Sequence, residues 1–344
     1  MRAPPQYRRL ADGRRHFNDG PIDLVIEAFG EPDAVESAYA AAWRRFQTIL
    51  DELCAELPLL RAQAAPDGPR PAGPVARRMA AAVAPFCDAH FITPMAAVAG
   101  AVAEEILQAM TGAAPLRRAY VNNGGDIALH LSAGERFSIG MVDRPDRPSL
   151  IGAATIAARD PIRGVATSGW RGRSFSLGVA DAATILARTA ASADAAATLV
   201  ANAVDLPGHP AIRRAPASSR DPQSDLGDRL ATVGVGALTP AEIDEALARG
   251  LAEAERLRAL GAIAAAALRL CGETRLCGVE ARRYNRLDGQ REAVNNPLRH
   301  CERSEAIQAA PGPLQTPKGL LRRFAPRNEG TGDGRQGAER HAVG

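Results

Sequence analysis

The chain has 344 residues, of which 46% are apolar and 24% charged, and its formal net charge is +3. This length allows one large domain or two small ones, and the apolar fraction is enough for a sizeable core. No apolar run of about 18 residues occurs, so the sequence predicts no membrane-spanning helix. The first residues contain no apolar segment typical of a signal peptide, so we expect a cytoplasmic protein.

The basic residues are concentrated near the C-terminal end. Residues 281–344 carry twelve Lys or Arg and seven Asp or Glu, so residues 1–280 are close to neutral. We therefore expect no nucleic acid partner. Lys318 is the only lysine, which excludes a phosphate-loop lysine or a lysine Schiff base in residues 1–280. The five cysteines form no Cys-x-x-Cys pair and are expected to be free thiols, with a Cys271–Cys277 redox pair as the alternative.

The N-terminal third alternates strand and helix patterns. Turn residues and apolar periodicity predict two short strands within 7–30, a helix over 33–57, a loop over 65–74 and a helix that Thr93 caps and that ends before Gly112. The small residues of 96–103 give this second helix a smooth face that permits close backbone contact.

The following part is richer in strands. We expect a strand, turn and strand over 120–132, further strands at 137–142, 152–157 and 174–186, a small-residue helix over 193–204 and a loop over 207–225. Thr239 and Glu242 fit a capping box that opens a helix running to about Leu260, and the segment 262–271 is expected to pack back onto the core. Helices alternate with paired strands without a regular βαβ period, which predicts an α+β fold with helices layered on antiparallel sheet.

Three short polar stretches stand in an Ala- and Val-rich background. Each places carboxylate, amide or hydroxyl oxygens beside residues too small to block a ligand. They are Asn122-Asn123-Gly124-Gly125-Asp126, Ala166-Thr167-Ser168-Gly169 and Asp194-Ala195-Ala196-Ala197-Thr198.

The third stretch places Asp194 and Thr198 four residues apart, so on a helix they project from one face. A carboxylate and a hydroxyl so placed can both bind a hard cation such as Mg²⁺, which prefers oxygen ligands. The alternative is structural: Asp194 caps a helix and Thr198 bonds back to its own helix.

The first stretch predicts a tight turn between strands, in which Gly124 and Gly125 allow positive φ and close approach to a ligand. A hairpin turn alone explains Asn-Gly equally well, although Asp126 adds a carboxylate. The second stretch offers the hydroxyls of Thr167 and Ser168 and the amide of Gly169 to a phosphate, or forms an ordinary loop.

In order and spacing, the three stretches resemble the motifs of the ApbE family, the FAD:protein FMN transferases, over about residues 7–280. The resemblance implies a single ApbE-like (T-fold-type) α+β domain of layered antiparallel sheets with helices. It implies that Mg²⁺ is held by Asp194, Thr198 and the carbonyl of Ala166. It also implies that Asn123, Gly124, Gly125, Asp126, Thr167, Ser168 and Gly169 bind FAD.

One segment departs from the family pattern. Proven transferases carry an H-x-I-D-P-type segment after the second motif, and its histidine assists proton removal from the acceptor hydroxyl. The corresponding residues 174–181 contain no histidine. Asp181 is the candidate replacement base, so flavin binding is better supported than FMN transfer.

Three functions remain open. The first is a Mg²⁺-dependent enzyme that transfers FMN from FAD to a protein acceptor or cleaves the FAD diphosphate. The second is a flavin or nucleotide-binding module without turnover, and the third is an interaction protein that uses the Ala-rich helices. No sequence feature fixes the oligomeric state.

The composition changes after residue 280. The stretches 298–308 and 319–328 resemble a translated intergenic repeat, and the low apolar content of 281–344 predicts disorder. A functional basic arm is the alternative.

If this tail has no packed structure, deleting residues 288–344 should leave the melting temperature within about 2 °C, because little buried apolar area is lost. Thermal unfolding of the full and shortened chains measures this. A fall of about 10 °C would show instead that the tail packs on the domain.

Overall fold

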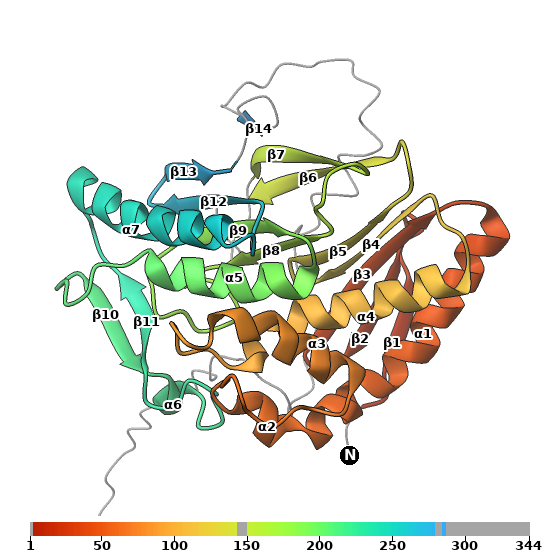
Figure 1. Cartoon of the computed structure of the whole chain (residues 1–344), viewed down its shortest axis with the longest axis horizontal. Helices are drawn as coiled ribbons and strands as arrows, with labels where there is room; N and C mark the ends of the chain where they lie inside the picture. Colours follow the sequence, from red (N-terminus) through yellow and green to blue (C-terminus); the bar gives the residue numbers. More distant parts are fainter. Residues whose placement is uncertain (1–2, 143–149, 279–283, 287–344) are drawn as a thin grey trace, which may run out of the picture.

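The computed structural model describes residues 3–142, 150–278 and 284–286. Its main element is a nine-stranded antiparallel sheet with the order β1-β2-β3-β4-β5-β8-β9-β12-β13 (Figure 1). The strands are β1 (Gln6–Arg9), β2 (Arg15–Asp19), β3 (Ile22–Phe29), β4 (Arg118–Asn123), β5 (Asp126–Leu131), β8 (Gly164–Ser168), β9 (Ala182–Ala187), β12 (Ala265–Leu270) and β13 (Glu273–Cys277).

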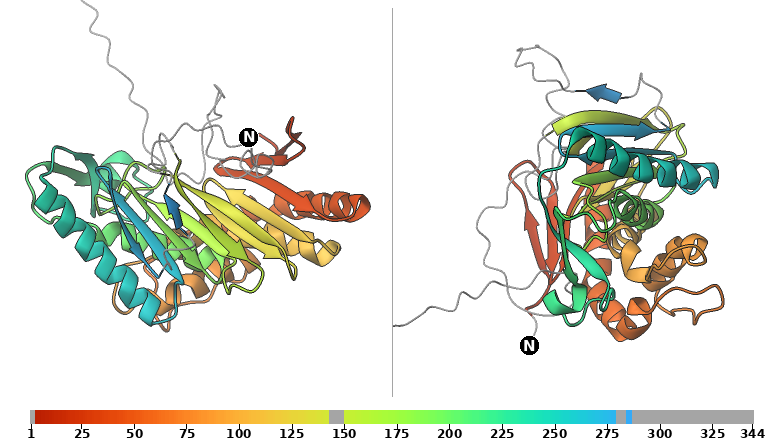
Figure 2. Two further views of the ribbon diagram at one scale, coloured as in Figure 1. Left: turned by 90° about the horizontal axis from the view of Figure 1, so that it is seen from above. Right: turned by 90° about the vertical axis from the view of Figure 1, so that its left-hand side faces the viewer.

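The helices gather on one face of this sheet (Figure 2). They are α1 (Pro32–Ala55), α2 (Leu57–Arg61), α3 (Pro74–Val83), α4 (Val98–Ala113), α5 (Ala190–Ala203) and α7 (Pro240–Ala259), with the short helices η1 (Ala84–Phe86) and η2 (Pro94–Ala97). Their apolar sides and this sheet face form the larger of two hydrophobic cores.

The opposite face carries the smaller core. There the hairpin of β6 (Arg136–Val142) and β7 (Leu150–Ala157) covers part of the sheet, and β14 (Tyr284–Arg286) pairs with β7. Phe137 and Ile156 of the hairpin meet Tyr120 and Leu129 of the sheet. A further hairpin, β10 (Ile212–Pro216) and β11 (Leu230–Val235), is joined by α6 (Ala217–Arg220) and a loop.

The predicted α+β class with layered antiparallel sheet is confirmed, and so are the helix over 33–57 and the capping box, in which Thr239 and Glu242 bond reciprocally. The predicted tail 281–344 lies outside the described residues except for β14. None of the helices in the described part combines the length and apolarity that a membrane span requires.

Several boundaries differ from the sequence prediction. The predicted strand 174–186 begins only at Ala182, as β9 (Ala182–Ala187), and β8 was not predicted because its motif suggested a loop. Gly112 lies inside α4 instead of after it. Thr93 directly precedes η2, but its side chain does not cap that helix, and its hydroxyl donates to Asp225 instead. The helix α3, the strand β10 within the predicted loop 207–225, and the strand form of 265–270 were also missed.

Helices α4 and α5 approach each other closely because small residues line the contact. A Cβ added to Gly100 would lie 2.2 Å from the carbonyl oxygen of Ala190, well inside van der Waals contact. A Cβ on Gly164 of strand β8 would lie 2.1 Å from the carbonyl oxygen of Thr189, just before α5. Strand β8 thus approaches the start of α5 as closely as α4 does. The position of α5 over the sheet therefore depends on glycine at both sites.

Gly100→Ala should destabilise the protein by about 2–3 kcal/mol, because α4 and α5 must separate to admit the methyl group. Gly112→Ala on the same helix is the matched control, since no atom lies within 4 Å of its added Cβ. It should leave stability unchanged or raise it by up to about 1 kcal/mol. Urea unfolding measures both, and equal stabilities for the two variants would contradict the packing described for Gly100.

Candidate functional site

The first polar stretch forms the turn between β4 and β5. Gly124 and Gly125 occupy its two central positions with φ of +65° and +115°, a conformation that glycine adopts readily. The side-chain oxygen of Asn122 accepts a hydrogen bond of 2.8 Å from the amide of Gly125 and stabilises the turn. The guanidinium of Arg173 lies over the turn, where a Cβ on Gly124 would meet its Nη2 atom at 1.8 Å.

The two residues that flank this turn reach other elements. The buried Asn123 donates from Nδ2 to the carbonyl of Ala99, at 3.1 Å, and its Oδ1 atom accepts from the amide of Asp23. Asp126 accepts from the amide of Thr167 through Oδ1, at 3.3 Å. The turn is thus bonded both to the start of α4 and to β8, which carries the second polar stretch.

The second stretch lies at the end of β8. Ala166 is fully buried, and the Thr167 hydroxyl is 2.9 Å from the hydroxyl of Thr184 on β9. Ser168 is half-buried at the last position of the strand. Gly169 permits a close crossing of two backbones, because a Cβ there would lie 2.4 Å from the carbonyl oxygen of Asp181.

The third stretch lies on α5, with Asp194 one turn before Thr198 as predicted. Asp194 is 4% exposed, and its Oδ2 atom accepts bonds of 3.1 Å from the amides of both Ala99 and Gly100 in the first turn of α4. A carboxylate at this place also interacts favourably with the helix dipole. Asp194 therefore caps a neighbouring helix, which agrees with the first half of the structural alternative.

These contacts bring all three stretches together. Asn123 bonds to the carbonyl of Ala99 while Asp194 bonds to the amide of the same residue, and Asp126 connects the turn to Thr167. The sequence placed these motifs about 30–70 residues apart. In the fold, they meet where the ends of β4, β5 and β8 lie under helices α4 and α5.

Asp181 has partners of its own. Its Oδ1 atom accepts from Nε of Arg171 at 3.1 Å, and its Oδ2 atom accepts from the amide of Cys271 at 2.7 Å. Arg171 in turn stacks on Trp170, with its guanidinium carbon 4.1 Å from the ring centroid. The carboxylate thus joins the start of β9 to the turn after β12.

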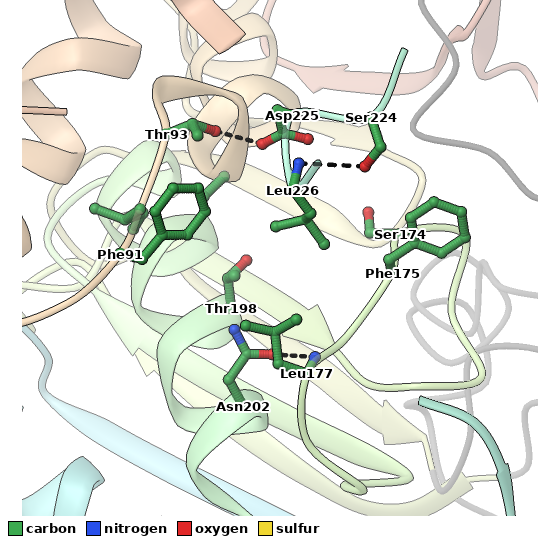
Figure 3. A pocket seen from close by; sticks show the side chains of 12 residues that line it. Phe91, Thr93, Ser174, Phe175, Leu177, Thr198, Asn202, Ser224, Asp225 and Leu226 are labelled. Carbon is green, nitrogen blue, oxygen red and sulfur yellow. Dashed lines mark hydrogen bonds between the residues drawn. The ribbon is translucent and has the colours of Figure 1, made fainter. Parts of the chain in front are cut away.

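A pocket opens beside α5 at the C-terminal side of Asp194 (Figure 3). Thr198 and Asn202 of α5 line it together with residues from three other segments. The remaining lining residues are Phe91, Ile92, Thr93, Ala96, Ser174, Phe175, Leu177, Ser224, Asp225 and Leu226. Asp181 and Asp194 are not among the lining residues.

The pocket walls are fixed by side-chain hydrogen bonds. Asn202 accepts from the amide of Leu177 at 2.8 Å and from the hydroxyl of Ser176, which holds the loop after β8 against α5. The hydroxyl of Thr93 donates to the carboxylate of Asp225, which lies in the loop between α6 and β11. The pocket is partly open to solvent, and its volume of about 40 Å³ is enough for a few water molecules.

Thr198 is the one residue of the predicted site that lines this pocket. Asn202 and Asp225 were missed. Asn202 lies one helical turn beyond the recognised motif, so helical spacing from Thr198 could have indicated it. Asp225 lies in a loop whose sequence matches no recognised motif and has no helix or strand periodicity, so nothing in the sequence indicated it. Within the described residues, no group of three or more His, Cys, Asp or Glu side chains is placed to hold a metal ion.

Comparison with known protein families identifies the chain. The model of the family described as AbpE bacteria matches residues 7–276, so the chain belongs to this family. The resemblance seen in the sequence is therefore confirmed.

Several UPF0280 proteins are similar to this chain. The UPF0280 protein of Methanothrix thermoacetophila is 38% identical over 147 residues, which are 39% of this chain and 53% of the relative. The UPF0280 protein of Methanocella arvoryzae is 37% identical over 206 residues, 59% of this chain and 78% of the relative. The chain thus spans about half the length of the first relative and over three quarters of the second.

The crystal structure of the flavinyl transferase ApbE of Pseudomonas stutzeri, in its apo form, is similar at 11% identity. It has a TM-score of 0.36, and the match covers 80% of this chain and 95% of that chain.

The position of Asp181 has a consequence for Cys271, an exposed thiol at the same turn. Partial burial of the sulfur and the nearby Asp181 charge raise the pKa of Cys271 above its ordinary value. Asp181→Asn removes the negative charge, so the pKa of the thiol should fall and its alkylation by iodoacetamide at a fixed pH should become faster.

The rate is measured against pH in both proteins, with Cys271→Ser giving the background from other thiols. A shift of the profile to lower pH in Asp181→Asn is expected. An unchanged midpoint, with only a uniform change in rate, would contradict the electrostatic coupling.

Proposed function

We propose that this ApbE-like protein binds a flavin nucleotide, FAD, together with Mg²⁺, where the three polar stretches meet beside α5. The observation that carries the proposal is their convergence: separate segments bond to one another around Ala99, and Thr198 of the third stretch lines a pocket. The family membership supports the same ligand class.

The donor atoms at the site have the chemistry that Mg²⁺ requires. Thr198 offers a hydroxyl to the pocket, Ala166 offers a carbonyl on β8, and Asp194 a carboxylate one turn from Thr198. All are oxygen ligands, which Mg²⁺ prefers, and few of them are needed because Mg²⁺ keeps several waters and binds substrate phosphates. When bound, the cation would neutralise the charge of the FAD diphosphate.

The small volume of the pocket limits which part of FAD it can hold. A space of about 40 Å³ would take the cation with a few of its waters, and the flavin and adenine rings would lie outside it. Asn123, Gly124, Gly125 and Asp126 at the turn, with Thr167, Ser168 and Gly169 at the end of β8, are the residues proposed to contact the rest of the nucleotide. Arg173 over Gly124 adds a positive charge beside that turn.

We favour binding over FMN transfer as the function. A base for transfer has to reach the acceptor hydroxyl, whereas the Asp181 carboxylate is bonded to Arg171 and to the Cys271 amide and does not line the pocket. Transfer of FMN to a protein acceptor, or cleavage of the FAD diphosphate, is the alternative, and FMN released from added FAD would reveal it. The cytoplasm is the location that we propose.

Calorimetric titration with FAD, with and without Mg²⁺, tests the proposal. Asp194→Asn and Thr198→Val should each keep the fold and weaken Mg²⁺-dependent binding by at least about tenfold, or about 1.4 kcal/mol, because each removes a cation ligand. Thr111→Val is the matched control, since that hydroxyl bonds to the Leu107 carbonyl within α4 and does not line the pocket.

Thermal melts of the variants show whether the fold is kept, which matters because Asp194 also caps α4. Equal affinity of the native protein for FAD with and without Mg²⁺ would contradict the metal assignment. No binding of FAD under either condition would contradict the flavin proposal as a whole.

A further inference from the structure

The hairpin of β6 and β7 leaves a second cavity, on the face of the sheet away from the helices (Figure 1). Its volume is about 180 Å³, and it is partly open to solvent. The lining residues come from the hairpin, from the loop before β8 and from strands β9, β12 and β13. They are Met141, Ala154, Thr155, Ile156, Asp160, Pro161, Ile162, Thr184, Leu186, Ala264, Ala265, Ala266, Ala267, Leu276 and Gly278. None of them lines the pocket beside α5.

Small side chains on β12 account for the space. Ala265 pairs with Leu186 and Ala267 with Thr184, so these four side chains lie on one face of the sheet. Leu186 packs against the core under the hairpin, which places this face toward the hairpin. Protein interiors contain few voids larger than a water molecule. Methyl groups on β12, where aromatic and branched side chains fill the rest of this layer, thus leave room for a ligand.

The cavity wall is apolar apart from three side chains. Thr155 is exposed, and the Thr184 hydroxyl already bonds to that of Thr167 at 2.9 Å. Asp160 is 8% exposed, and its Oδ2 atom accepts from the amide of Ala157 at 2.9 Å. A carboxylate accepts several hydrogen bonds, and bonds to a charged acceptor are the stronger ones. A ligand that matches this wall has an apolar body and one N–H or O–H group.

The volume limits the size of this ligand. An apolar cavity of about 150 Å³ admits a benzene ring. A space of about 180 Å³ therefore has room for one aromatic ring with small substituents or for two small fused rings, and a whole flavin or nucleotide exceeds it.

We infer that this cavity binds a small aromatic compound with one hydrogen-bond donor, a simple phenol or an indole. The ring lies between Ala154 of the hairpin and Ala265 of the sheet, and its donor group bonds to the Asp160 carboxylate. No residue of the proposed flavin site lines the cavity, so this inference is independent of the proposed function.

Calorimetric titration of the full chain with indole tests the inference. Indene is the matched ligand, because its fused rings have the same shape without the N–H group. The native chain should bind indole with a dissociation constant below about 1 mM. Asp160→Asn keeps an acceptor for the Ala157 amide but removes the charge. It should weaken indole binding about tenfold and indene binding by less than about twofold.

Two variants fill the cavity from opposite walls. Ala265→Leu on the sheet and Ala154→Val on the hairpin should each weaken the binding of both ligands by at least about tenfold. The melting temperature should stay the same or rise, because each added side chain occupies empty space. Ala153→Leu is the matched control: this neighbour of Ala154 does not line the cavity, so the variant should bind like the native chain.

A crystal soaked with a brominated indole gives a measurement without any variant. An anomalous peak between the hairpin and β12 is expected, and a peak only elsewhere overturns the inference. No binding of indole by the native chain overturns it, and so does native affinity in both cavity-filling variants. Equal losses of indole and indene binding in Asp160→Asn overturn the assigned hydrogen bond. FAD binding should be the same in all these variants, so the outcome for the flavin proposal is read separately.

Discussion

The buried carboxylate of Asp194 joins parts of the fold that would otherwise be independent. It accepts from two amides in the first turn of α4, and the carbonyl of Ala99 in that turn accepts from Asn123 at the end of β4. An uncompensated charge at 4% exposure would be costly, so this bonding specifies how α5 sits against α4. Because Thr198 lies on the same helix, the position of the pocket depends on the same contact.

Close backbone approach is the second condition for the site. Gly100 permits contact of α4 with the start of α5, and Gly164 brings β8 to Thr189 just before α5. The alanines of α5 are almost all buried, so the helix packs against the sheet with little side-chain volume between. The alanines of α5 thus let this helix come close to the sheet, where the polar residues of three segments lie within hydrogen-bonding distance.

The sequence was informative where local physics decides the structure. The capping box at Thr239, the apolar period of 33–57 and the Asn-Gly-Gly-Asp turn are local patterns, and the structure has each of them. It was uninformative where tertiary contacts decide. Strand β8 needs its partner β9 to be recognised, and Thr93 looks like a helix cap although its hydroxyl bonds to Asp225, 132 residues away. The contribution of Ser224, Asp225 and Leu226 to the pocket wall has no local sequence signal at all.

A helix cap and a cation ligand are different uses of one carboxylate, and we propose both for Asp194. The proposal depends on Thr198, which lies four residues further along α5 and lines a pocket, while α4 holds Asp194 from the other side. The Asp225 carboxylate at the far wall makes the pocket more acidic than the motifs alone would. The site that we propose for FAD and Mg²⁺ thus lies at the junction of sheet and helices.

The most direct measurement is anomalous diffraction from crystals grown with FAD and Mn²⁺ in place of Mg²⁺. We predict an anomalous peak inside the pocket, at about 2.0–2.2 Å from the Thr198 hydroxyl oxygen, with diphosphate density beside it. A peak elsewhere on the molecule, or flavin density with no cation beside α5, would contradict it.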